Sequence, residues 1–258
     1  MKVAVQETEP GTRWTATAPT GATARARLGR LHTTHTWLEA EESVPSPTLR
    51  GLATALAVAA GVPVAAKAKP GTPRHRWLTE AGATAYQIVP PSDIDCTDPD
   101  NLAWASRPVP TGVEITDLTD LSDDAVLDLW TDFYVWVHER WSPVADRQAA
   151  REIFAPMMAE ELDRSRSVLV VRDGRPSAHG FVFAEDDGWL VCCEAVAADV
   201  PHGPEDVDAC LRGVVAVLAR SGAQDLTVDG HVDDPHLYPA LLGVPHVTGA
   251  GLHLLHLG

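Results

Sequence analysis

Cysteine, methionine and aromatic residues are scarce in this chain of 258 residues. It contains 4 cysteines and 3 methionines, and the aromatic residues make up 6% of it. The cysteines show neither the paired spacing of a zinc site nor the regular pattern of a disulfide framework. We therefore expect a reducing compartment, the cytoplasm, and no bound metal.

Long hydrophobic runs are also lacking. No segment approaches the roughly 18 apolar residues that a membrane-spanning helix needs, so we expect no membrane association. The N-terminal residues contain no apolar core of a secretion signal, and none is expected. Phosphate-binding loops, dinucleotide fingerprints and the nucleophile motif of serine hydrolases are absent from the sequence.

Positive charge is in short supply, because the formal net charge is −16. Acidic and basic residues nearly balance over residues 1–110, and residues 111–258 carry almost all of the excess negative charge. Such a surface repels phosphate backbones, so we expect no nucleic-acid partner. The acidity either keeps the protein in solution or attracts a cationic amine substrate, and the composition leaves both open.

The pattern of apolar residues and turn residues divides the chain into two halves. Residues 1–90 predict several strands with one capped helix, and residues 112–258 predict helices, strands and a further helix. Residues 91–111 are rich in proline and aspartate and lack apolar periodicity, which predicts a linker. In the second half, Ser142-Pro143 predicts the start of a helix that ends near Leu162.

One strand of the second half is unusual. Trp189–Val196 is apolar except for Glu194, and burying an unpaired carboxylate is costly. Glu194 therefore faces either a cavity or a partner. A helix beginning at Pro204 and ending at Gly222, a strand at Asp225–Val228 and a short helix at Asp234–Leu242 are predicted to follow.

The two halves resemble each other. Leu49-Arg50-Gly51 lies in the helix of the first half, and Leu211-Arg212-Gly213 lies in the corresponding helix of the second. In both halves the order is strand, capped helix, glycine, strand, short helix, glycine and strand. The shared order indicates an internal repeat.

This order of elements resembles the GNAT superfamily of N-acyltransferases, with a tandem arrangement and a shortened first copy. The resemblance implies an α/β fold of the α+β type, made of two units. Each would be a mixed, mostly antiparallel sheet with helices on both faces. The units would be a partial GNAT-like domain at 1–90 and a complete one at 112–258, joined by the linker at 91–111.

The resemblance also implies a site. Glu194 matches the strand carboxylate that serves as the general base in many GNAT enzymes. Tyr238 is the candidate acid for the departing thiolate, but it lies one position away from the family's spacing, and packing in the core is the alternative role. The pantetheine arm of the donor would lie along the strand that contains Glu194, and the donor-binding residues would be Val191, Cys192, Cys193, Ala195, Val196 and Gly203.

The sequence departs from the family at the pyrophosphate-binding loop. Only Gly203 fits the pattern of this loop, and Asp199, Glu205 and Asp206 would repel an anion. The acyl donor is therefore either an acyl-coenzyme A or an acyl-phosphopantetheinyl carrier protein. An acidic carrier protein would suit the basic residues of the first half, such as Arg25 and Arg27.

Other side chains have both a functional and a structural interpretation. His179 is a reserve base, and Cys192 is either a nucleophile or a small buried hydrophobe. Four residues lie where GNAT substrate-binding helices occur, and each either contacts substrate or packs in the core: Trp130, Tyr134, His138 and Trp141.

We therefore expect the second half to transfer an acyl group to the primary amine of a small molecule, such as one of secondary metabolism. The alternative is a non-catalytic GNAT-like binding protein that has lost the coenzyme A site. Fold resemblance by itself does not identify the acceptor.

Overall fold

The computed structural model describes residues 2–186 and 188–258. Two compact units are present. The first contains the residues through Ile88 together with His138–Asp146 and Ala250–Gly258, and the second contains Val89–Val137 and Arg147–Gly249. Each unit has one seven-stranded sheet and its own hydrophobic core.

The sheet of the first unit has the strand order β1-β2-β3-β4-β5-β14-β6. Strands β1 to β4 pair antiparallel, β4 and β5 are parallel, and β5 and β14 are antiparallel. The strands are β1 (Ala4–Glu9), β2 (Arg13–Thr17), β3 (Thr23–Leu28), β4 (Thr36–Glu39), β5 (Val64–Ala68), β6 (Thr84–Val89) and β14 (Leu252–Leu257).

Helices α1 (Ser46–Ala60) and α2 (Pro73–Glu80) pack together over one face of this sheet. Small residues such as Ala16, Ala24 and Ala26 point toward α1, and they let its leucines Leu52 and Leu56 approach the strands closely. α1 begins after Pro45 and ends at Gly61, whose φ of 74° is in the left-handed region that glycine adopts without strain. Both helices lie on one face, and the expectation of a mixed, mostly antiparallel sheet flanked by helices is confirmed for this unit.

The opposite face of the first sheet is covered in part by the segment His138–Asp146. The Ala145 amide donates to the Leu31 carbonyl at 3.1 Å, and Ser142 has no exposed surface. The aromatic ring of Trp141 lies 6.3 Å from that of Tyr86, which is in β6. This segment therefore lies over a sheet that lacks the two early helices of a complete copy.

The sheet of the second unit has the order β13-β7-β12-β11-β10-β9-β8. β11 and β12 are parallel, and the other neighbouring pairs are antiparallel. The strands are β7 (Asp93–Asp95), β8 (Val113–Thr116), β9 (Val168–Arg172), β10 (Arg175–Glu185), β11 (Gly188–Ala195), β12 (Asp225–Asp229) and β13 (Val247–Thr248).

Helices cover both faces of this second sheet. α6 (Gly203–Arg220) packs on one face with α3 (Pro99–Ala105), and α7 (Leu237–Leu242) packs beside α6. The other face contacts α4 (Asp123–His138), whose Trp130 ring lies 5.2 Å from Phe181 and 5.8 Å from Phe154 of α5 (Arg147–Glu160). Alternating residues of β10 and β11 therefore face either α6 or α4.

The observed division of the chain differs from the one expected from sequence. Residues 91–111 contain β7 and α3, and Ile94, Cys96 and Trp104 are buried in the core of the second unit. Strand β7 pairs with β12 and β13, so residues 91–111 do not form a free linker.

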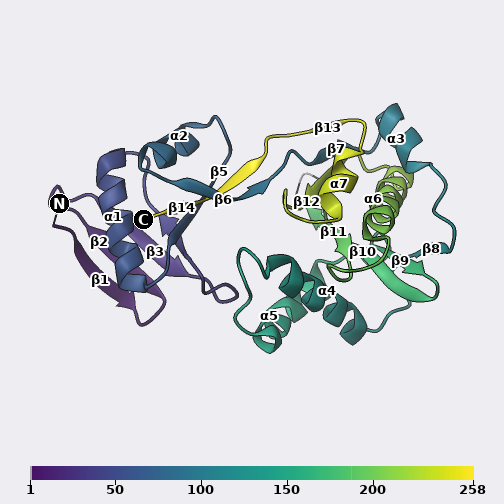
Figure 1. The fold of residues 1–258 in the computed structure, drawn as a ribbon, viewed down its shortest axis with the longest axis horizontal. Coiled ribbons are helices and arrows are strands. Elements are labelled where there is room, and N and C mark those ends of the chain that lie inside the picture. The colour runs from purple at the N-terminus through teal and green to yellow at the C-terminus, as the bar shows by residue number, and fades with distance from the viewer. Residues whose placement is uncertain (1, 187) are drawn as a thin grey trace. The chain divides into compact units, whose positions relative to one another are not determined.

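The last strand of the chain, β14, belongs to the first sheet. It lies between β5 and β6, as the yellow arrow between two blue ones in Figure 1 shows. Residues 1–90 are therefore only part of the first unit, and the C-terminal end of the chain completes it.

Candidate active site

Strands β11 and β12 pair in parallel over four residues, and β11 continues beyond the end of β12. Their register begins at Trp189 opposite Leu226 and ends at Cys192 opposite Asp229, although β11 continues to Ala195. Glu194 lies beyond the last paired residue. We call this end of the β11–β12 pairing, where β11 continues without β12, the opening.

Glu194 is buried at the opening, and both of its carboxylate oxygens have hydrogen-bond partners. Its Oε1 accepts from the Ala195 amide at 2.7 Å and lies 2.8 Å from Nδ1 of His236. Its Oε2 accepts from the amides of Leu237 at 3.0 Å and His236 at 3.4 Å. The side chain of Glu194 is 1% exposed. Its partner is thus an imidazole and the amides that begin α7.

His236 was not identified from the sequence. It directly precedes α7, and its ring packs against the start of α6, where a Cβ on Gly203 would lie 2.5 Å from Cδ2 of His236. Only glycine allows this approach. The indole of Trp136 lies 6.4 Å from the imidazole in an edge-on arrangement. The only sequence signal for this contact is Gly203, which also fits one position of a phosphate-binding loop.

A second imidazole–carboxylate pair lies on the same connection between β12 and α7. The His231 amide donates to Oδ2 of Asp234 at 2.6 Å, and the imidazole Nδ1 lies 3.5 Å from the same oxygen. Burial raises the pKa of Asp234. Two histidines and two carboxylates are thus buried near the end of the β11–β12 pairing.

His179 lies directly opposite Glu194 in the register of β10 and β11. Its ring contacts Phe133 at 5.0 Å and Phe181 at 4.6 Å, and neither ring nitrogen has a hydrogen-bond partner among the described residues. Burial lowers the pKa of His179 to about 3. A base this weak is poorly matched to a proton transfer near neutral pH.

The cysteines near the opening are buried thiols. Cys192 Sγ lies 3.9 Å from Oδ2 of Asp229. Burial and this carboxylate raise the pKa of Cys192 well above its usual value. A hydrogen bond with Cys210, together with burial, raises the pKa of Cys193. Neither thiol is poised to act as a thiolate nucleophile.

Three of the remaining residues expected to bind donor have side chains in the core, and Val196 is half-buried. Val191, Cys193 and Ala195 face α6, and the Val196 amide donates to the Ser177 carbonyl at 3.0 Å. Gly203 begins α6. Any contact with a donor along this strand would therefore involve backbone atoms.

The four residues expected to bind substrate fall into different units. Trp130 and Tyr134 lie on α4 in the second unit, where burial and the negative charge of Asp229 raise the pKa of Tyr134. His138 and Trp141 belong to the first unit, where their rings lie 4.7 Å apart. Tyr238 is half-buried in the first turn of α7.

The amino end of α6 is occupied by acidic groups. Asp206 is buried, and Arg172 contacts both its carboxylate oxygens at 3.0 Å through Nε. Glu205 lies in the same turn, and Pro204 has no N–H to donate. The amides of Gly203 and Asp206 donate to carbonyls of Val200 and His202. This helix end therefore offers few free donors to an anion.

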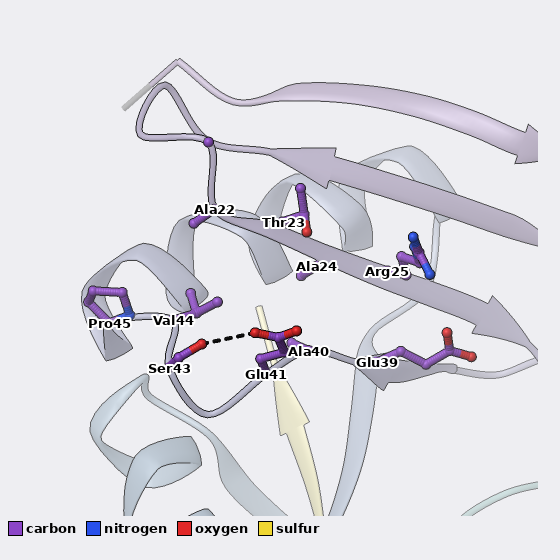
Figure 2. Close-up of a pocket in the computed structure, with 11 residues that line it drawn as sticks. Ala22, Thr23, Ala24, Arg25, Glu39, Ala40, Glu41, Ser43, Val44 and Pro45 are labelled. Carbon is purple, nitrogen blue, oxygen red and sulfur yellow. Dashed lines mark hydrogen bonds between the residues drawn. The ribbon is translucent and has the colours of Figure 1, made fainter.

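The corresponding place in the first unit is a cleft of about 480 Å³ between β3, β4 and the start of α1. Figure 2 shows its lining, including Arg25, Glu39 and the hydrogen bond from Ser43 to Glu41. Two of its charged groups are carboxylates, which do not favour a phosphate ligand.

Among the described residues, one group has the spacing of a metal site: Asp98, Asp100 and His246. Nδ1 of His246 lies 3.0 Å from Asp98, and Nε2 lies 3.7 Å from Asp100. Asp98 raises the pKa of His246, so the imidazole is itself stabilised as a cation between two carboxylates. Within residues 2–186 and 188–258, no helix has the length and apolar character required to cross a bilayer.

No protein-family model and no curated protein matches the sequence. Solved structures do resemble it. A GCN5-related N-acetyltransferase from Sphaerobacter thermophilus is 15% identical with a TM-score of 0.60, covering 95% of this chain and 80% of that one. A second, from Kribbella flavida, is 13% identical with a TM-score of 0.52, covering 90% and 86%.

A tandem GNAT protein from the clavulanic acid biosynthesis pathway is also similar. It is 12% identical with a TM-score of 0.59, and the similarity covers 99% of this chain and 84% of that protein. The strand order of both sheets and these similarities together show that the chain has the fold of the GNAT superfamily in its tandem form.

Proposed function

We propose that the second unit is an N-acyltransferase that moves an acyl group from a pantetheine thioester to the primary amine of a small molecule. The observation that carries this proposal is the end of the β11–β12 pairing at Cys192 and Asp229, with a buried carboxylate–imidazole pair beside it. A thioester arm can pair with the strand backbone that β12 leaves unpaired, next to groups able to accept a proton.

The surroundings of this opening suit a cationic acceptor. Asp229 is close enough to Cys192 and Tyr134 to raise both of their pKa values, and the ring of Trp136 lies near His236. Carboxylates and aromatic rings together recognise amines. The clavulanic acid pathway of one similar protein supports placing the acceptor among small biosynthetic amines.

The donor is better matched by a phosphopantetheinyl carrier protein than by coenzyme A. The acidic first turn of α6 and its shortage of free amides disfavour a pyrophosphate. A carrier protein presents the same arm without the adenosine diphosphate group. Arg25 and Arg27, exposed on one face of β3, offer a basic surface for an acidic carrier.

Calorimetric titration tests the donor, with acetyl-coenzyme A in one experiment and phosphopantetheine in the other. Equal affinity for the two ligands supports a carrier-protein donor, whereas much tighter binding of the coenzyme identifies coenzyme A itself. Thiol release in the presence of a panel of amines then tests turnover. Absence of binding and of turnover contradicts the proposal and favours a non-catalytic role.

A charge reversal at α6 sharpens this test. We expect Glu205→Lys to strengthen binding of coenzyme A relative to phosphopantetheine by about tenfold, because it removes a carboxylate and adds a cation at the helix end. Glu152→Lys, an exposed position on α5, makes the same change in net charge and is the control. If the two variants change the affinity for coenzyme A equally, the pyrophosphate of a bound coenzyme does not lie at the amino end of α6.

A further inference from the structure

The carboxylate of Glu194 has no acceptor position left for a substrate proton. An ionised carboxylate accepts about four hydrogen bonds, and Glu194 has contacts with three backbone amides and one imidazole nitrogen. For Glu194 to take a proton from an amine, one of these contacts would have to break. Its role in the resting site is to hold His236.

The contact with Glu194 determines which nitrogen of His236 is available. A carboxylate only accepts, so Nδ1 of a neutral His236 carries the proton and Nε2 carries the free lone pair. Nε2 has no hydrogen-bond partner among the described residues. It lies at the backbone of Gly203, where a Cβ would be 2.6 Å away. Of the Glu194 and His236 side chains, it is therefore Nε2 of His236 that keeps a lone pair able to accept a proton.

Other buried groups near the opening do not provide a comparable acceptor. His179 is enclosed by Phe133 and Phe181, and its neutral form is too weakly basic. His231 faces Asp234 on the far part of the same connection. The thiol of Cys192 and the phenol of Tyr134 are protonated donors that burial keeps neutral.

We propose that His236 accepts the proton of the attacking amine through Nε2, with Glu194 as its positioning residue. This inference rests on the proposed acyl transfer. The neutral amine attacks the thioester carbonyl, a C–N bond forms, and the amine proton passes to Nε2. The C–S bond then breaks, the thiolate leaves with its electron pair, and the imidazolium returns the proton to it. The products are an amide and a thiol.

Kinetics of His236→Gln and Glu194→Gln test the inference. We expect His236→Gln to lower kcat by about 10²–10⁴-fold, with a smaller change in KM, and to remove the acidic limb of the pH–rate profile. Glu194→Gln keeps an oxygen for Nδ1–H but loses the charge that stabilises the imidazolium. It should lose less activity and move the acidic limb to lower pH.

His231→Gln is the matched control, because it disrupts the other imidazole–carboxylate pair of the same connection without touching Glu194. It should leave the position of the acidic limb unchanged. If His236→Gln keeps wild-type kcat and the same acidic limb, the inference is overturned while the proposed function stands. If the wild-type protein turns over no amine, the proposed function itself fails, and the inference with it.

A second measurement uses the wild-type protein and so does not depend on whether a variant folds. Long-range ¹⁵N–¹H NMR of wild-type protein reports which nitrogen of each neutral histidine bears the proton. We expect neutral His236 to be protonated at Nδ1, with Nε2 bare. Protonation at Nε2 in the neutral ring would overturn the inference, because the free lone pair would then face the carboxylate.

Discussion

At the scale of single residues, the site depends on the absence of one side chain. Gly203 begins α6, and the ring of His236 lies in the space that a Cβ would occupy. The ring is held from its other side by Glu194. Because the contacts on both sides are close, a small change at Gly203 should move the imidazole.

We expect Gly203→Ala to displace His236, lower kcat and reduce the free energy of unfolding by about 1–3 kcal/mol, because the added methyl group overpacks the site. Gly213→Ala on the same helix is the control. There a Cβ would meet Val168 at 3.4 Å, an ordinary contact, and alanine favours the helix by up to about 1 kcal/mol. Enzyme assays and thermal unfolding measure both effects, and similar behaviour of the two variants would argue against a tight Gly203–His236 contact.

At the scale of elements, β14 has the largest effect on the organisation of the chain. It is the last strand in the sequence, yet it lies between β5 and β6 in the first sheet. Leu255 and Leu257 of β14 are buried in the core of the first unit. Residues 1–90 therefore lack an internal strand of their own sheet.

We expect Leu255→Ala to reduce the stability of the first unit by about 2–5 kcal/mol, because a buried leucine leaves a cavity. Leu242→Ala is the control, since Leu242 in α7 is 69% exposed. Hydrogen exchange resolved by residue should show the loss of protection in β5 and β6. Unchanged protection there would contradict the placement of β14.

The segment His138–Asp146 is the second element that departs from its expected position. Ser142-Pro143 predicts a helix start, but α5 begins at Arg147. Ser142 is instead buried, and its carbonyl lies 2.6 Å from Nδ1 of His32. The long-range contact takes precedence over the local capping signal, and such contacts cannot be identified from a single sequence.

At the scale of the whole molecule, buried histidines couple stability to pH. Burial and the neighbouring positive groups His256, His32 and Lys67 lower the pKa of His35 to about 4 from 6.5. Between these values the unfolded chain binds a proton that the folded chain excludes, so stability falls as the pH decreases from about 6.5 to about 4. His179 acts in the same direction in the second unit.

We expect His35→Phe to reduce the acid sensitivity of the first unit, because phenylalanine keeps the ring packing without a titrating group. His246→Gln should have the opposite effect in the second unit. The raised pKa of His246 stabilises the fold at low pH, and this contribution is lost as the pH rises through that pKa. Hydrogen exchange at pH 7 and pH 5 measures each unit, and identical acid sensitivity of His35→Phe and wild type would contradict the first expectation.

The sequence by itself determined the local elements and their order. Alternating and helical patterns placed the strand containing Glu194, the helix after it and the repeat of the two halves, because these features depend on neighbouring residues and on burial of one face. It also singled out Glu194, since a lone carboxylate in an apolar strand needs a partner.

The tertiary structure alone decided what that partner is and how the two units are composed. His236, β14 and His138–Asp146 are joined to their contacts across many intervening residues, and a local pattern contains no information about such contacts. The acceptor of a proton is defined by which lone pairs remain free. That depends on the backbone amides of α7 and on a close approach at Gly203.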